Sequence, residues 1–285
     1  MKDIFIRFPQ GKLKAFTLSF DDGPYCDRRL MEIFDKNNLK CTFNLNSYAC
    51  IDEADITDNP KRWMTKKEIL ETYSDKPHEV AIHGEHHLYM EKLSPASALF
   101  EAANDRAALE DMFNTTIRGM AYPYGTYSDD VVNAIKAAGI VYSRTTEASH
   151  SFDIPTDWLR LSPSCHYLDE KFDELLDKFV NESPYDTPFR SNSWLFYVWG
   201  HSFEFVNNDN WEVAEKFAAK AANHDDIWYA TNIEIYDYVD AFNHLIFNHD
   251  QTIVTNPTAT DLWFEHGRCS KDIVCIKAGE TKKML

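Results

Sequence analysis

Residues 15–45 have the sequence AFTLSFDDGPYCDRRLMEIFDKNNLKCTFNL, and this order of elements decides the fold. Ala15–Phe20 is a short apolar strand that ends in two acids and a Gly-Pro turn. Asp27–Asp35 is typical of a helix, and Lys40–Leu45 of a second strand. A strand, a helix and another strand in succession predict two parallel strands joined by a crossover helix.

The same alternation continues along most of the chain. Strands are predicted at Glu79–His83, Ile117–Ala121, Ile140–Arg144, Trp194–Gly200 and Asp226–Thr231. Helices are predicted at Thr65–Tyr73, Ser94–Phe113, Ser128–Ala138, Asp169–Val180, Trp211–Ala222 and Ile233–Leu245. The first of these helices has a capping-box pattern, with Thr65 as N-cap and Glu68 at the third position. For a chain of 285 residues, this alternation predicts a closed or nearly closed α/β barrel.

The pattern changes after Asn248. TIVTN (252–256), DLWFEH (261–266) and DIVCIKAGE (272–280) are typical of two or three strands without intervening helices. We therefore predict a (β/α) barrel over residues 1–248 and a small β appendage, packed on the barrel, over residues 249–285.

The composition narrows the classes of partner. The chain carries 29 Lys and Arg against 46 Asp and Glu, a formal net charge of −17. Such an acidic surface repels nucleic acid and anionic lipid, so neither is an expected partner. No apolar run approaches the roughly 18 residues of a membrane span, and the N-terminal segment lacks the apolar centre of a signal peptide. The six cysteines, Cys269 among them, contain no C-x-x-C and are expected to be reduced in a cytoplasmic protein. The oligomeric state is left open.

Four predicted strands end in polar clusters. They are Ser19–Gly23, His83–His87, Ala121–Gly125 and Trp199–Glu204. Parallel α/β folds carry their chemistry at the carboxyl ends of the strands, so these clusters are the candidate site.

The first two clusters contain candidate metal ligands. Asp21 and Asp22 are adjacent carboxylates that repel each other unless a cation or proton lies between them, although D-D-G-P is also ordinary turn chemistry. His83 and His87 are four residues apart, so one helical turn would place both imidazoles on one face. Glu85 stands at the third position, which does not fit the metalloprotease H-E-x-x-H pattern. A polar surface loop is the alternative.

The other two clusters are candidates for acid catalysis and oxyanion binding. Pro123 and Gly125 constrain the backbone at Tyr124, and such a turn can direct an N–H at a developing oxyanion. A purely structural turn is the alternative. His201 follows an apolar strand, where it is either a general acid or a hydrogen-bonded core histidine.

Taken together, the clusters resemble a known family. Asp21-Asp22-Gly23, His83-x-x-x-His87, Pro123-Tyr124-Gly125 and His201 are similar in order and spacing to the motifs of the polysaccharide deacetylases, carbohydrate esterase family 4, over residues 13–205. The resemblance implies a distorted (β/α) barrel that binds a divalent metal ion, most often zinc, with cobalt and nickel as alternatives. It implies metal ligation by Asp22, His83 and His87, a general base at Asp21, a general acid at His201 and an oxyanion contact from the Tyr124 N–H. Pro123, Tyr124 and Trp199 would line the substrate site.

This chain departs from the family pattern in the third motif. Ala121 stands where the family usually has an arginine that orients the base. Either Asp21 has a raised pKa or another arginine reaches it. Arg144, at the end of the next strand, is the best candidate, and Arg118 is the weaker one.

Two further motifs match loosely. Asp157-Trp158 resembles the fourth motif, whose tryptophan packs over the acid histidine. Trp199 replaces a leucine before His201, which predicts a differently shaped pocket floor. Glu204 is either a contact for substrate hydroxyls or an ordinary exposed carboxylate. One or two tryptophans are expected to stack on sugar rings, among Trp63, Trp158, Trp199 and Trp228.

The predicted function is a metal-dependent hydrolase that removes an acetyl or other acyl group from an N-acetylated sugar or oligosaccharide. The alternatives are a deacylase of a small non-sugar amide and a catalytically inactive carbohydrate-binding protein on the same scaffold.

Overall fold

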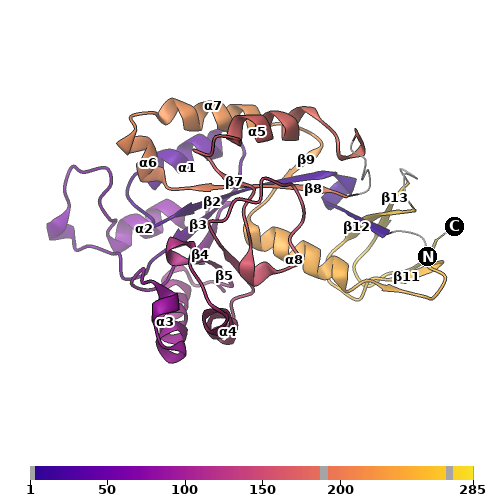
Figure 1. Ribbon diagram of the computed structural model, residues 1–285, viewed down its shortest axis with the longest axis horizontal. Helices are drawn as coiled ribbons and strands as arrows, with labels where there is room; N and C mark the ends of the chain where they lie inside the picture. The colour runs from indigo at the N-terminus through magenta and orange to yellow at the C-terminus, as the bar shows by residue number, and fades with distance from the viewer. Residues whose placement is uncertain (1–3, 187–191, 268–271, 285) are drawn as a thin grey trace.

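A central parallel sheet organises the molecule (Figure 1). The computed structural model describes residues 4–186, 192–267 and 272–284. The strands of this sheet are β2 (Lys14–Asp21), β3 (Cys41–Leu45), β4 (Glu79–Ile82), β5 (Gly119–Ala121), β6 (Tyr142–Arg144), β7 (Cys165–His166), β8 (Trp194–Gly200) and β9 (Ile227–Tyr229). Their order is β6-β5-β4-β3-β2-β8-β7, and β9 also pairs with β2.

Strand β2 lies at the centre of the sheet and is buried along its whole length, although it alternates apolar residues with polar ones. It pairs with β8 from Lys14 to Phe20, while β9 and β3 share its other edge. The pairing with β3 extends to Asp21 opposite Asn44, so the ladder holds the end of β2 firmly. The acids of the first polar cluster therefore project from the most constrained strand of the sheet.

The sheet curls until its two edge strands nearly meet. The Thr145 N–H donates to the Leu161 carbonyl, and the Leu161 N–H donates to the Ser143 carbonyl. Three residues later the Ser164 N–H donates to Tyr197 of β8. The segment from Leu161 to Ser164 thus joins β6 to β8 and almost closes the ring. The predicted distorted (β/α) barrel is confirmed.

Helices cover the sheet on both sides. They are α1 (Asp27–Lys36), α2 (Lys66–Tyr73), α3 (Pro95–Phe113), α4 (Asp129–Ala137), α5 (Phe172–Asn181), α6 (Ser202–Asn207), α7 (Trp211–Ala221) and α8 (Asn232–Asn243). In Figure 1, α1, α5 and α7 lie above the sheet and α3 and α4 below it. The predicted capping box between Thr65 and Glu68 is confirmed at the start of α2. Helix α6 has no counterpart among the predicted elements.

Two small antiparallel sheets lie at the end of the molecule away from α2 and α3 (Figure 1). One contains β1 (Ile4–Arg7), β12 (Leu262–His266) and β13 (Ile273–Ile276); the other contains β10 (Ile246–Phe247), β11 (Ile253–Thr255) and β14 (Thr281–Lys283). Strand β1 was not predicted. It pairs with β12, and a buried ion pair between Arg7 and Glu265 joins the two strands. The division of the chain at residue 248 stays a prediction.

Two observations concern the chain as a whole. Within the described residues, none of the helices combines the length and apolar character needed to cross a membrane. Cys26, Cys41, Cys50, Cys165 and Cys275 are free thiols, and Cys269 lies outside the described residues.

Candidate functional site

The end of β2 brings two carboxylates close to the same histidine ring. Asp21 is buried, and its Oδ1 accepts a hydrogen bond from the Asn44 amide at 2.8 Å. Asp22 has a positive φ of 77°, so the chain turns there and the usual alternation of side chains is broken. As a result both acids approach the same ring: His83 Nε2 lies 3.8 Å from Asp21 and 3.6 Å from Asp22.

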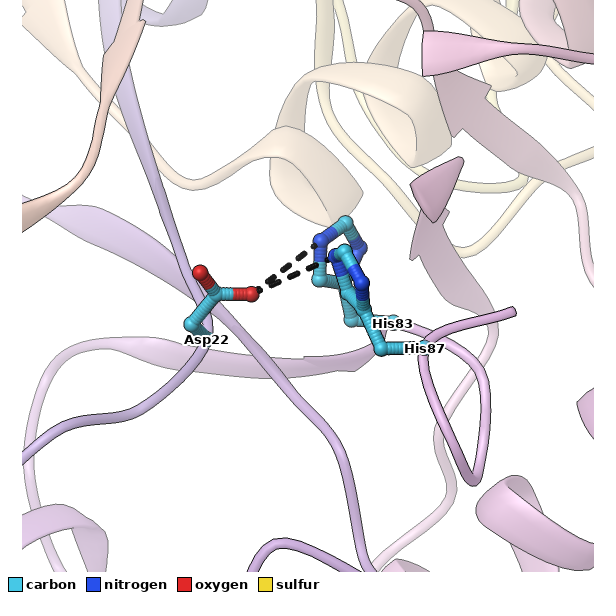
Figure 2. Close-up of side chains that lie close together, drawn as sticks. All are labelled: Asp22, His83 and His87. Carbon is cyan, nitrogen blue, oxygen red and sulfur yellow. Dashed lines mark ion pairs between the residues drawn. The ribbon is translucent and has the colours of Figure 1, made fainter. Parts of the chain in front are cut away.

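Asp22, His83 and His87 form a candidate metal centre. Figure 2 shows both imidazoles turned toward one oxygen of Asp22. That oxygen, Oδ1, is 3.6 Å from His83 Nε2 and 3.5 Å from His87 Nε2. One ligand atom from each residue lies within 4.8 Å of the other two. Two nitrogens and one carboxylate oxygen are a common protein ligand set for zinc.

The two histidines meet through a turn, and the prediction of a helical turn between them is wrong. Residues 83–87 follow β4 as a bend in which Gly84 and His87 have positive φ angles of 78° and 54°. The ring centroids are 4.8 Å apart. Gly84 is required here, because a Cβ at this backbone angle would meet Pro123 Cγ at 3.2 Å.

The surroundings of His83 fix which of its nitrogens faces Asp22. Its Nδ1 lies 2.7 Å from the Ala121 carbonyl oxygen, which can only accept, so Nδ1 carries the proton. The Nε2 lone pair then faces Asp22. Burial lowers the pKa of His83 by more than the adjacent Asp21 and Asp22 raise it, which favours the neutral ligand form. Asp105 accepts the His83 backbone N–H at 3.0 Å and anchors the start of the turn.

Arg144 reaches Asp21 from the end of β6. The guanidinium donates a hydrogen bond to Asp21 Oδ2, and both side chains are almost wholly buried, at 0% and 3% exposure. Arg118, the weaker candidate, instead pairs with Asp237 on the surface. Burial raises the pKa of Asp21, but the charges of Arg144, His83 and His201 outweigh it and hold that pKa below its ordinary value. The alternative of a raised pKa at Asp21 is therefore wrong.

His201 approaches the same acids from the end of β8. Its Nε2 is 3.9 Å from Asp21 and 4.0 Å from Asp22. Burial lowers the pKa of His201, but its hydrogen bond with Glu204 and the charges of Asp21 and Asp22 outweigh this effect and raise it. The protonated form is thereby favoured.

Trp199 lies between the arginine and the histidine. The Arg144 guanidinium stands 4.3 Å above the centre of its ring, a cation–π contact in a buried setting. The same ring meets His201 edge-on at 5.6 Å. Trp199 thus packs against both charged groups and separates them.

Tyr124 and Pro123 form the wall beside His87. Tyr124 has a positive φ of 59° within the short turn Pro123–Gly125, and its ring is 48% exposed. The ring meets His87 edge-on at 4.5 Å and stacks on Tyr89 at 3.7 Å. Pro123 is buried against Gly84. Tyr89 was missed in the sequence, because a tyrosine in a loop carries no periodic signal.

The loose fourth-motif match is wrong in its structural placement. Asp157 is half exposed and pairs with Arg160, and Trp158 packs edge-on against Tyr236 of α8. Neither contacts His201. Trp228, another candidate platform, packs against Phe8 and Tyr238 in the core.

Two contacts of Glu204 were not expected. Glu204, expected at the surface, lies 3.4 Å from His201 Nδ1, and it also lies 3.2 Å from His166 Nε2. His166 could not be identified in the sequence, because β7 is only two residues long and shows no strand pattern.

A pocket of about 370 Å³ opens beside the metal-ligand cluster. Asp22 and His87 form part of its lining, with Tyr48 and Trp63 among the other side chains. Both aromatic residues belong to the connection between β3 and α2 and are exposed. Trp63 was among the candidate platforms in the sequence, and Tyr48 was not.

Comparisons with known proteins show what the chain is similar to. Residues 9–143 match the polysaccharide deacetylase family model. A Mycobacterium smegmatis protein assigned to the polysaccharide deacetylases has the same fold, with a TM-score of 0.56 and 19% identity over 84% of this chain and 94% of that one. A Streptomyces lividans family 4 carbohydrate esterase in complex with acetate matches with a TM-score of 0.47 and 16% identity over 72% and 86%. A Bacillus anthracis pseudoenzyme of the same esterase family matches with a TM-score of 0.47 and 20% identity over 81% and 67%. The part of the chain that resembles the polysaccharide deacetylase family by sequence is thus residues 9–143.

Proposed function

We propose that the chain is a metal-dependent deacetylase that hydrolyses the acetamide of an N-acetylated sugar or short oligosaccharide. The observation that carries the proposal is the cluster of Asp22, His83 and His87 beside the buried ion pair of Asp21 and Arg144. It combines a cation-binding ligand set with a carboxylate held in its charged form. Metal-dependent hydrolysis of an amide uses both.

Asp22, His83 and His87 would hold the ion. The donor set fits, because the Nε2 lone pair of His83 is directed at Asp22 and the third ligand atom lies within 4.8 Å. Zinc suits two imidazoles and one carboxylate best, and cobalt and nickel accept the same set. A divalent ion bound there supplies Lewis acidity toward the acyl carbonyl and toward a water molecule.

Asp21 would act as the general base. Arg144 and Asn44 occupy its two oxygens from the sides, and they keep the carboxylate in one orientation. Arg144 also lowers the pKa of Asp21, so the group is ionised and ready to accept the proton of the attacking water. Arg144, on β6, would thus take the role of the base-orienting arginine that is missing at position 121.

Tyr124 and His201 would complete the reaction from opposite sides. The left-handed turn at Tyr124 exposes backbone next to His87, where its N–H would stabilise the oxyanion. His201 would donate a proton from Nε2 to the departing nitrogen, which is otherwise a very poor leaving group. The raised pKa of His201 keeps that proton available near neutral pH.

The pocket next to Asp22 supports a small sugar substrate. Its volume of about 370 Å³ lies in the lower part of the range for small-molecule sites, ~300–1,000 Å³. Trp63 and Tyr48 would offer ring faces for stacking on a pyranose, and Trp199 would shape the floor near the acyl group.

Acetate release tests the proposal. The purified protein is supplied with Zn²⁺ or Co²⁺ and assayed on N-acetylglucosamine oligomers and on small acetamides. Release that is abolished by chelation, by Asp22→Ala and by Asp21→Asn is the expected result. A preference for small acetamides would identify a deacylase of non-sugar amides. Stoichiometric metal binding without release from any substrate would contradict the proposal and favour a carbohydrate-binding protein.

A further inference from the structure

Glu204 lies between two histidines at the rim of the barrel. His166 comes from the end of β7, His201 from the end of β8, and Glu204 from the first turn of α6. The two oxygens of Glu204 have different partners. Oε2 lies 3.2 Å from His166 Nε2, and Oε1 lies 3.4 Å from His201 Nδ1.

The proton on His166 can be assigned from its other contact. The Leu168 backbone N–H donates to His166 Nδ1 at 3.0 Å, so this nitrogen must carry the lone pair. The neutral ring then carries its proton on Nε2, which faces Glu204 Oε2. The His166 ring therefore presents its N–H to the carboxylate at ion-pair distance.

A second donor occupies the same oxygen. The His201 backbone N–H donates to Glu204 Oε2 at 3.1 Å, which is the capping interaction of α6. The backbone hydrogen bond and the His166 contact both engage Oε2, so a rotation of the carboxylate would lose both. The other oxygen, Oε1, remains directed at the His201 ring. Hydrogen bonds from the two histidines lower the pKa of Glu204 to about 2, although burial raises it, so this oxygen is a charged acceptor.

The consequence appears on the far side of the His201 ring. Because the charged Oε1 of Glu204 faces Nδ1 at 3.4 Å, a proton on Nδ1 is favoured, and the nitrogen left to exchange a proton with substrate is Nε2. That atom lies 3.9 Å from Asp21 and 4.0 Å from Asp22, inside the candidate site.

We propose that Glu204 is a positioning residue, held by His166, that fixes the ring orientation and tautomer of His201 and so makes the site selective for substrates with an amine leaving group. The inference rests on the proposed deacetylase function. During the reaction the C–N bond breaks, the Nε2 proton moves to the departing nitrogen, and the Nδ1 proton stays on His201 against Glu204. A substrate whose leaving group departs as a stable anion does not need this proton.

A role in capping α6 would account for the hydrogen bond at Oε2 but not for the contact between Oε1 and His201. Glu68 provides the matched comparison, because it also stands at the third position of a helix, α2, and accepts the N-cap N–H of Thr65 at 3.0 Å. Its carboxylate binds Arg62 and lies outside the candidate site. A capping role is therefore shared by Glu68 and Glu204, whereas the contact with His201 is not.

The substitution Glu204→Gln is the sharpest variant. The His201 backbone N–H and the His166 ring both face the position of Oε2, so the glutamine side chain would place its oxygen there. Its NH₂ group would then face His201 Nδ1. That nitrogen would then have to accept, and the proton of the neutral ring would move to Nε2. Nitrogen-15 NMR of the histidine rings in the zinc-loaded protein should report this change of tautomer at His201, and Glu68→Gln should leave it unchanged.

Kinetics on two substrates provides the functional readout. On an N-acetylglucosamine oligomer, Glu204→Gln should lower kcat by about 30- to 100-fold. On 4-nitrophenyl acetate, whose leaving group needs no proton, the rate should stay within about threefold. Glu68→Gln should leave the rates on both substrates unchanged, although it should lower the melting temperature.

Three outcomes would overturn the inference. They are an equal loss on both substrates, no loss on either substrate, and an unchanged His201 tautomer. If the wild-type protein releases no acetate from any amide, the proposed function fails, and the NMR comparison still decides whether Glu204 orients His201.

Discussion

The two sides of the candidate site hold their charged groups in different ways. On one side, Asp21 and Arg144 form an ion pair that is almost completely buried at the ends of two strands. On the other side, His201 and Glu204 are each 21% exposed and come from a strand end and the first turn of a short helix. The buried pair suits a group that must stay ionised and in one orientation. The partly exposed pair suits a group that must exchange its proton with solvent in each turnover.

The largest expected effect comes from breaking the buried side. Arg144→Ala leaves Asp21 buried without its cation, so we expect kcat to fall roughly 10²- to 10³-fold and the free energy of unfolding to fall by about 3–5 kcal/mol. Steady-state kinetics and urea unfolding measure the two effects. Arg118→Ala is the matched control, because its surface pair with Asp237 contributes at most about 1 kcal/mol. An Arg144→Ala enzyme with unchanged kcat would exclude this arginine as the partner of the base.

Substitutions at two neighbouring histidines, His86 and His87, test the metal-ligand cluster that lies between the two sides. His87→Ala should weaken Zn²⁺ binding at least 100-fold, because it removes one of three protein ligands. His86→Ala should keep the Zn²⁺ site of Asp22, His83 and His87 intact, since His86 belongs with Glu85 and Glu101 to a separate group of possible ligands. Titration calorimetry on metal-free protein measures both. Equal loss in the two variants would mean that the ligand set is assigned incorrectly.

The buried carboxyl group of Asp27, which contacts Ser202 next to His201, should make the stability of the protein depend on pH. Burial raises the pKa of Asp27 to about 7, although hydrogen bonds from Ser202 and Tyr73 oppose the shift. The folded protein therefore binds this proton more tightly than the unfolded chain, and stability falls as pH rises. Asp27 should account for a loss of roughly 2 kcal/mol between pH 5 and pH 7.

The substitution Asp27→Asn tests this dependence. It should flatten the decrease in stability over that interval in chelator-treated protein, as measured by urea unfolding at several pH values. A variant with the same pH dependence as the wild type would show that Asp27 does not titrate there.

The smallest effect is expected at the pocket wall. Trp63 is 38% exposed, and its loss should raise KM for an N-acetylated oligosaccharide about five- to tenfold with little change in kcat. Phe100→Ala is a suitable control, because Phe100 is 63% exposed on α3 and is absent from the lining of this pocket. A KM that is unaffected by Trp63→Ala would place the sugar elsewhere.

Sequence reasoning succeeded where the signal was periodic or local. The apolar run of β2 and the capping box of α2 were visible because strand and cap patterns are short-range. It failed where geometry depends on distant segments. Gly84 and His87 have positive φ angles in a turn where Gly84 packs against the distant Pro123, which no helical spacing could indicate. Strand β1 pairs with β12 across more than 250 residues.

The contrast between the two sides can be measured directly with one pair of variants and one pair of substrates. The zinc-loaded protein is assayed on an N-acetylglucosamine oligomer and on 4-nitrophenyl acetate, with Asp21→Asn and His201→Gln beside the wild type. We predict that Asp21→Asn loses both activities, since water attack is common to both, and that His201→Gln loses only amide hydrolysis. Equal losses on both substrates in both variants, or full amide hydrolysis by His201→Gln, would contradict the division of the site into a base side and an acid side.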